Sequence, residues 1–281
     1  FIGTSYYCHV GGWVLRYVVS YITEAQTVYA DPLGYFYGLL GYNAATGETW
    51  FPLTAILFAA VFMAVNAVII IKGVEGGIEK FNKVGMPALF VILIVLLART
   101  ITLDGAQVGF AYMLSCDWSK VGFNTFLSAL GQAFFSLSLG MAIMITYGSY
   151  LDRKQNLEKN ALIIVIMDTL VALMAGLCVM PARFALDPTG EIGGPKLLFI
   201  TMQNVFDSMG GVVGPIFGII FYLLVVLAAV SSSISLLETV VTHFVDKAAE
   251  QGKGDKRKFY SFIASIAIAV LCVLVCMDGL G

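Results

Sequence analysis

Long runs of apolar residues, separated by short polar segments, make up most of this chain. Because a hydrocarbon core of roughly 30 Å needs about 20 apolar residues per helix, each such run predicts a membrane-spanning helix. The pattern predicts seven of them, at residues 1–23, 50–71, 84–102, 124–151, 159–180, 211–243 and 258–277. The composition agrees, since 59% of the residues are hydrophobic, 12% are charged and the mean hydropathy is +0.89. We therefore expect an all-α polytopic membrane protein, with residues 1–281 in one transmembrane domain.

The basic residues predict which loops face the cytoplasm. Residues 25–49 contain no Lys or Arg, whereas eleven of the 16 basic residues follow the second, fourth and sixth predicted helices. The positive-inside rule places those three loops in the cytoplasm, so the first helix runs from inside to outside. The intervening loops are then external. The longest of these, residues 181–210, contains several Gly and Pro residues but ends in an apolar stretch, and we expect short helices there that lie over an outer vestibule.

The fourth predicted helix contains a break. Its segment from Gly131 to Tyr150, GQAFFSLSLGMAIMITYGSY, carries Ser136, Ser138 and Gly140 between two aliphatic halves. Serine and glycine let a backbone leave the helical state at low cost, so we expect two half-helices joined by a short hinge. In lipid such a break is tolerated only where it is buried in protein or lines a cavity. The break therefore predicts a functional site.

Several polar residues lie inside the predicted helices. Asp168 follows Lys159 by nine residues, which places it roughly 13 to 14 Å into the membrane. A carboxylate there is either functional or a hydrogen-bonded structural acid, because unpaired it costs several kcal/mol. The Ser231–Ser233 run either bonds back to helix carbonyls or offers hydroxyl ligands to Na⁺. Arg16 and His9 have no evident role.

The sequence does not predict an enzyme. The five cysteines show no metal-ligand spacing, His9 and His243 are isolated, and no nucleophile and base pair or phosphate-binding loop stands out. The net charge of −2 gives no sign of a nucleic-acid partner. Because Phe1 begins inside one apolar run and Gly281 follows directly on another, we expect an internal fragment of a longer protein.

Four separated motifs resemble one family. GQAFFSLSLG, SSSISLLE, GGPKLLFITMQNVF and KGVEGGIEKFNKVGMP are together similar to the neurotransmitter:sodium symporters, specifically their bacterial amino-acid-transporting members. The resemblance covers essentially all 281 residues. It implies a partial inverted-repeat fold of five plus five helices, in which this chain supplies about helices three to nine and residues 124–151 form the broken sixth helix.

The resemblance also assigns residues to a site between broken helices. It implies substrate contacts at Gly3, Tyr7, Phe135, Ser136, Ser138, Met141, Ser232 and Leu236. It implies a first sodium site with Ser136 and Asp168, and a second with Ala228, Ser231 and Ser232. Tyr150 and Asp246 match an inner gate, and Glu238 matches a buried acid that braces the broken helices. The apolar Met141 and Leu236 favour a neutral, hydrophobic or aromatic amino acid.

Chloride dependence is not expected from the same comparison. Chloride-dependent members hold an anion partly with residues that match Gln132 and Ser136, together with a later serine. This chain has Ala172 at that later position, and Asp168 supplies a fixed negative charge instead.

These features predict a sodium-coupled symporter that imports a small amino acid by alternating access, with two Na⁺ sites, in the bacterial cytoplasmic membrane. Its partners would be the amino acid, the lipid bilayer and the missing helices of its own chain. One alternative is a proton-coupled amino-acid transporter of the same fold, with Asp168 or Glu238 carrying the proton. The other is a transport-inactive sensor or a channel-like protein.

Overall fold

The computed structural model describes residues 2–43, 45–103, 105–186, 194, 196–252 and 256–277. Within these ranges the chain is helical, and the strand-like pairing is limited to one isolated bridge between Tyr42 and Thr49. The long helices are α1 (Ile2–Thr23), α4 (Leu53–Ile71), α5 (Lys80–Ile101), α9 (Leu157–Leu186), α11 (Val213–Glu250) and α12 (Arg257–Met277). The shorter ones are α2 (Ala25–Ala30), α3 (Pro32–Leu39), α6 (Ala106–Leu114), α7 (Phe123–Ser136), α8 (Ile143–Ser149) and α10 (Met202–Ser208), with the π-helices η1 (Val74–Glu79) and η3 (Leu197–Thr201) and the 3₁₀ turn η2 (Trp118–Lys120).

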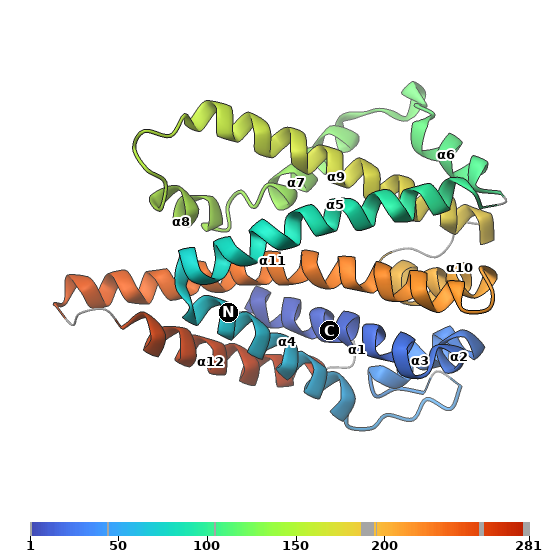
Figure 1. Ribbon diagram of the computed structural model, residues 1–281, viewed down its shortest axis with the longest axis horizontal. Coiled ribbons are helices and arrows are strands. Elements are labelled where there is room, and N and C mark those ends of the chain that lie inside the picture. Colours follow the sequence, from blue (N-terminus) through green and yellow to red (C-terminus); the bar gives the residue numbers. More distant parts are fainter. Residues whose placement is uncertain are drawn as a thin grey trace.

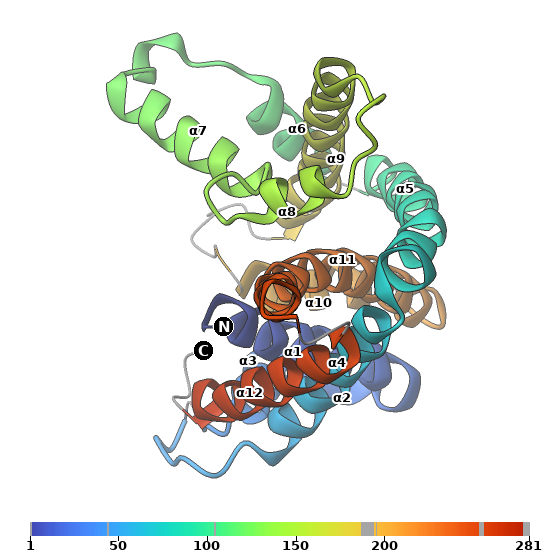
Figure 2. The same cartoon turned by 90° about the vertical axis from the view of Figure 1, so that its left-hand side faces the viewer.

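The long helices run side by side, with α11 in the middle of the bundle (Figure 1). Helix α11 packs against α1, α4, α5 and α12. Seen end-on in Figure 2, α5 lies at the side and connects two groups, α1 with α4, α11 and α12 on one side and α6 to α9 on the other. Within the second group, α8 of the broken helix faces α11 and contacts it.

Close packing of α1 against α4 depends on a residue without a side chain. A Cβ atom on Gly12 would lie 2.6 Å from the backbone nitrogen of Ala59, closer than real Cβ contacts allow. Small residues at such crossings let two helix backbones approach within a membrane protein. The α1–α4 contact therefore fixes the position of the part of α1 that carries Tyr7.

Five helical segments are long and apolar enough to cross a membrane: Leu53–Ile71, Val74–Ile101, Leu157–Phe184, Val213–Glu250 and Arg257–Met277. The other two predicted segments also appear as helices. Helix α1 carries Gly, His, Arg and Tyr residues that lower its hydropathy, and the segment 124–151 is interrupted. The all-α fold with a broken helix at 124–151 is thus confirmed.

Some helices continue beyond the approximate membrane-spanning ranges that the sequence predicts. In the third, the apolar helical segment runs from Val74 to Ile101, because η1 leads directly into α5 before residue 84. The sixth extends to Glu250 rather than residue 243, and the fifth continues through Pro181 to Leu186. Charged and polar residues were taken as loop markers in these places, although a helix can extend beyond the hydrocarbon core with such residues in water.

The external segment 181–210 contains the predicted short helices in its described part. Residues 187–193 and 195, which include Pro188, Gly190, Gly193 and Pro195, lie outside the described residues. After them, η3 and α10 pack against α2, α3, α9 and α11. The buried Gln203 connects α10 to η3 and α1. Its amide nitrogen donates to the Leu198 carbonyl at 3.2 Å, and its amide oxygen accepts from the Tyr21 hydroxyl.

The structure gives Arg16 and His9 structural partners. Arg16 forms an ion pair with Glu24, and Tyr35 donates to the same carboxylate at 2.9 Å. Burial raises the pKa of Tyr35 to about 12, so its phenol stays a donor at neutral pH. The Nδ1 atom of His9 lies 2.8 Å from the Cys276 thiol, which joins α1 to α12.

Candidate functional site

The break between α7 and α8 has a defined backbone geometry. Helix α7 ends in a Schellman motif, in which the Leu139 amide donates to the Phe134 carbonyl at 2.9 Å and the Ser138 amide to the Phe135 carbonyl at 3.1 Å. Ser138 has a φ of 56°, and Ala142, just before α8, has a φ of 60°. This left-handed conformation costs a non-glycine residue roughly 1 to 2 kcal/mol. Retained strain of this kind is typical of ligand sites and switch regions.

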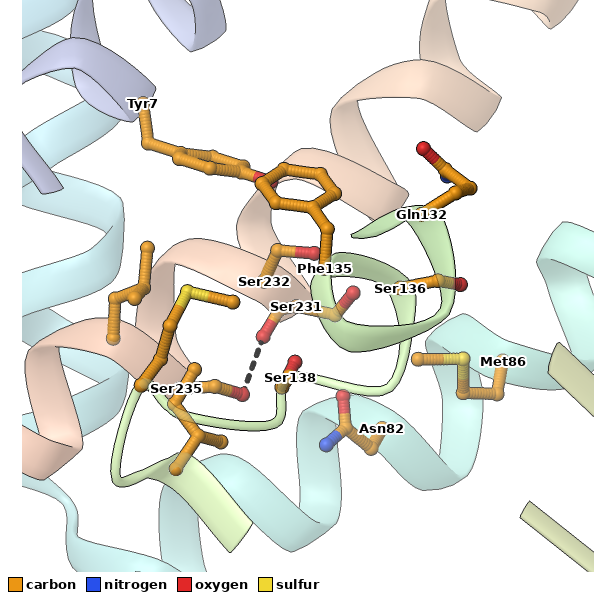
Figure 3. A pocket seen from close by; sticks show the side chains of 13 residues that line it. Tyr7, Asn82, Met86, Gln132, Phe135, Ser136, Ser138, Ser231, Ser232 and Ser235 are labelled. Atoms are coloured by element: carbon orange, nitrogen blue, oxygen red, sulfur yellow. Dashed lines mark hydrogen bonds between the residues drawn. The ribbon is translucent and has the colours of Figure 1, made fainter. Parts of the chain in front are cut away.

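A cavity of about 360 Å³ lies beside this break (Figure 3). Its walls come from α1, α5, α7, the hinge, α8 and α11. The lining residues are Tyr7, Asn82, Met86, Gln132, Phe135, Ser136, Ser138, Met141, Ile143, Ser231, Ser232, Ser235 and Leu236. Among the described lining residues, six hydroxyl groups and two amides share the space with apolar side chains, and none of these residues carries a charge.

The cavity brings together seven of the eight residues predicted to contact a substrate: Tyr7, Phe135, Ser136, Ser138, Met141, Ser232 and Leu236. Figure 3 shows Tyr7 extending from α1 toward Phe135. The eighth, Gly3, is exposed one turn before Tyr7 and does not line the cavity; a Cβ atom there would meet nothing within 4 Å. The predicted roles of these residues remain predictions.

The two side chains predicted for the first sodium site are in contact. The hydroxyl of Ser136, the last residue of α7, donates to Asp168 Oδ2 at 2.5 Å, which links the break to α9. Asp168 is half-buried. The hydrogen bond holds a carboxylate oxygen and a hydroxyl oxygen side by side, and a hard cation bound by both oxygens would replace this hydrogen bond.

The residues predicted for the second sodium site lie together on α11. Ser231 donates its hydroxyl to the Ala228 carbonyl at 2.8 Å, and both Ser231 and Ser232 line the cavity. This is the local bond expected of a serine in a membrane helix, and it keeps the carbonyl and the hydroxyl oxygen adjacent. In the described part of the chain no three His, Cys, Asp or Glu side chains form a metal cluster.

The two residues predicted for the inner gate, Tyr150 and Asp246, do not contact the same partner in the structure. Asp246 is exposed and forms no ion pair with any described residue. Tyr150 instead donates to Glu238 at 2.6 Å, and Glu238, with no exposed surface, accepts from Arg257 Nη2 at 2.5 Å. Glu238 is therefore one member of a buried ion pair.

Sequence reasoning missed four of the lining residues: Asn82, Met86, Ile143 and Ser235. Asn82 and Met86 belong to the KGVEGGIEKFNKVGMP motif, part of which was placed in a cytoplasmic loop. Arg257 was also missed as the partner of Glu238. Its position at the start of the last predicted helix was a usable signal, because a basic residue there is able to reach a neighbouring helix.

A family model described as Sodium:neurotransmitter symporter family matches residues 41–280. The chain belongs to this family. An uncharacterised sodium-dependent transporter from Haemophilus influenzae is 35% identical over 245 residues, covering 86% of this chain and 52% of that protein. The uncharacterised sodium-dependent transporter YhdH from Bacillus subtilis is 34% identical over 282 residues, covering 99% of this chain and 58% of YhdH.

Among solved structures, the crystal structure of MhsT in complex with L-phenylalanine aligns with a TM-score of 0.83 at 36% identity. The alignment covers 99% of this chain and 60% of the MhsT chain. It confirms the predicted symporter fold. The chain spans about half the length of the curated relatives it matches.

Membership in the sodium:neurotransmitter symporter family has two direct consequences. The relatives are described as sodium-dependent transporters, so the prediction that this chain is not an enzyme is confirmed. With five apolar helices long enough to span a bilayer, the chain is part of an integral membrane protein.

Proposed function

We propose that this chain forms part of a sodium-coupled symporter that imports a neutral, hydrophobic or aromatic amino acid by alternating access. The observation that carries the proposal is the cavity at the α7–α8 break, where hydroxyl groups and apolar side chains from α1, α7, the hinge and α11 converge. Membership in the symporter family and the fold shared with MhsT, whose structure holds L-phenylalanine, support it.

Each part of the cavity has a role in this proposal. The Tyr7 hydroxyl binds the substrate carboxylate, Ser138 contacts the substrate at the break, and Phe135 covers it from outside. Met141 and Leu236 line the space for the amino-acid side chain, and their apolar surfaces disfavour a charged one. Gly3 would widen the side-chain pocket because it lacks a Cβ atom. It does not line the cavity in this structure, so α1 would have to move for Gly3 to reach the pocket.

Sodium occupies two positions in the proposal. The first uses Ser136 and Asp168, whose oxygens are 2.5 Å apart. The second uses the Ala228 carbonyl with the hydroxyls of Ser231 and Ser232. Because Na⁺ at the first position would hold the end of α7, it orders the residues that also contact substrate. Each ligand then raises the affinity for the other, which couples their transport.

Chloride is not required in this proposal. Asp168 supplies a negative charge close to the first sodium position, and Ala172, one helical turn later, offers no hydroxyl to an anion. Gln132 lines the cavity as an amide that needs no anion beside it. Two of the relatives are bacterial, which supports the bacterial cytoplasmic membrane as the location.

Uptake of radiolabelled L-phenylalanine by the full-length protein in proteoliposomes tests the proposal. We expect accumulation only with an inward Na⁺ gradient. Uptake driven by a pH gradient without Na⁺ would favour proton coupling, for which Asp168 is the remaining candidate because Glu238 is paired with Arg257. Absence of flux for every amino acid tested would favour a sensor.

A further inference from the structure

One buried acceptor in the cavity has no hydrogen-bond partner among the residues that the structure describes. Asn82 on α5 lines the cavity, and Figure 3 shows its amide pointing from α5 toward the hinge. Its Oδ1 atom is buried and accepts no hydrogen bond from any described residue. A buried amide oxygen without a partner is unfavourable, so a ligand that satisfies it gains free energy.

The hydroxyls on the opposite wall supply further oxygen acceptors. Ser231 donates its only hydroxyl hydrogen to the Ala228 carbonyl at 2.8 Å, and Ser235 donates its own to the Ser231 carbonyl at 2.9 Å. Both hydroxyls therefore offer lone pairs to the cavity rather than hydrogens. Ser235 also accepts from Tyr147 at 2.8 Å, which fixes the orientation of its hydroxyl.

The electrostatic surroundings favour a positive ligand. Helix α7 ends at this cavity, so the negative end of its dipole lies near the hinge. None of the lining residues in the described part of the chain is Lys, Arg or His, so none of them competes as a cation for these oxygens. A small hard cation fits a set of neutral oxygens of this kind.

We propose that Asn82 is a Na⁺ ligand, which joins its Oδ1 atom to the hydroxyl oxygens of Ser231 and Ser235 around a cation position between α5 and α11. This inference rests on the proposed function, because it takes Na⁺ as the coupled ion. It adds a residue from α5 to sites whose predicted members lie on α7, α9 and α11. The ammonium group of a substrate would use the same acceptors, so the experiment distinguishes Na⁺ from the ammonium group as the ligand.

The test is thermal unfolding of the purified full-length protein in increasing Na⁺, with choline keeping the ionic strength constant. The variant Asn82→Leu keeps the approximate side-chain size but removes the oxygen, and we expect it to raise the Na⁺ concentration for half-maximal stabilisation by roughly tenfold or more. Asn82→Asp adds a negative charge and lowers that concentration below the wild-type value. Asn124→Leu, at an exposed asparagine of α7 outside the cavity, follows the wild type.

A second titration uses L-phenylalanine at saturating Na⁺. Lost phenylalanine affinity with an unchanged Na⁺ requirement in Asn82→Leu would assign the amide to the ammonium group and overturn the proposal. The proposal is also overturned if Asn82→Leu leaves the Na⁺ concentration for half-maximal stabilisation unchanged. If the leucine variant does not fold, an unchanged concentration in Asn82→Asp overturns it. A wild-type protein that Na⁺ does not stabilise overturns it as well. Failure of the proposed function is distinguishable, because it appears as Na⁺ stabilisation without amino-acid uptake.

Discussion

Replacing Arg257 by Met removes the charged partner of Glu238 and leaves a carboxylate buried without its cation. Glu238 lies in α11 with none of its side chain exposed, and Arg257 at the start of α12 has 19% of its side chain exposed. The two are 2.5 Å apart, and Tyr150 donates a further hydrogen bond to the same carboxylate. The pair therefore connects α11, α12 and the segment after α8.

The expected loss of stability follows from this geometry. Removing one partner of a buried ion pair costs about 3 to 5 kcal/mol, because the remaining charge stays desolvated. Water reaches part of Arg257, and the bonds from Tyr150 and Thr242 to Glu238 remain in the variant, so we expect a loss at or just below the lower limit of this range, about 2 to 3 kcal/mol. Replacing both partners, with Glu238→Gln and Arg257→Met together, costs less than the two single changes added.

Thermal unfolding of the purified full-length protein measures the effect. In a protein at least as long as this chain, a loss of this size lowers Tm by on the order of 5 °C. The matched control is Lys83→Met, which removes the cation of an exposed pair with Glu79, 72% and 48% exposed. Exposed pairs contribute about 0 to 1 kcal/mol, so its Tm stays close to the wild-type value. Equal Tm values for Arg257→Met and Lys83→Met, with additive effects in the double variant, would refute the reasoning.

Three further predictions concern the hinge, the α1–α4 contact and the carboxylate of α9. Ser138→Val forces a β-branched residue into a φ of 56° and lowers Tm, whereas Ser138→Gly keeps Tm at or above the wild-type value. A higher Tm for the valine variant than for the glycine variant would contradict the presence of backbone strain at this position. Gly12→Leu lowers Tm by disrupting the backbone contact with α4, whereas Gly38→Ala, where a Cβ atom meets nothing within 4 Å, does not; equal melting curves would exclude the close packing. Asp168→Ala abolishes sodium-driven uptake and Asp168→Asn weakens it or makes it chloride-dependent; wild-type uptake in both variants would make Asp168 a structural acid.

The break at 124–151 was predictable from sequence because its cause is local. Ser136, Ser138 and Gly140 interrupt an apolar run, and the structure ends α7 at Ser136 and takes Ser138 into the left-handed region. Sequence could not predict which residue would terminate α7, because a Schellman motif normally has Gly at the position that Ser138 occupies. Tertiary packing decides such a choice.

Contacts between distant residues were the least predictable feature. Glu238 and Arg257 are nineteen positions apart on different helices, and neither residue alone indicates the other. Asn82 was placed near a loop because lysines at positions 72, 80 and 83 surround it, although η1 and α5 carry the helix through this region. Asn82 then turns inward, and only the three-dimensional arrangement of α5 against α11 reveals it as a cavity residue. The family resemblance, rather than periodicity, brought Tyr7 into the predicted site.

We propose that the cavity at the α7–α8 break binds an amino acid together with Na⁺ and that the full-length protein moves both across the membrane. Uptake of radiolabelled L-phenylalanine into proteoliposomes that contain the full-length protein tests it most directly. We expect accumulation with an inward Na⁺ gradient, none when choline replaces Na⁺, and loss of accumulation in Tyr7→Phe. Equal uptake with and without Na⁺, or unchanged uptake in that variant, would contradict it.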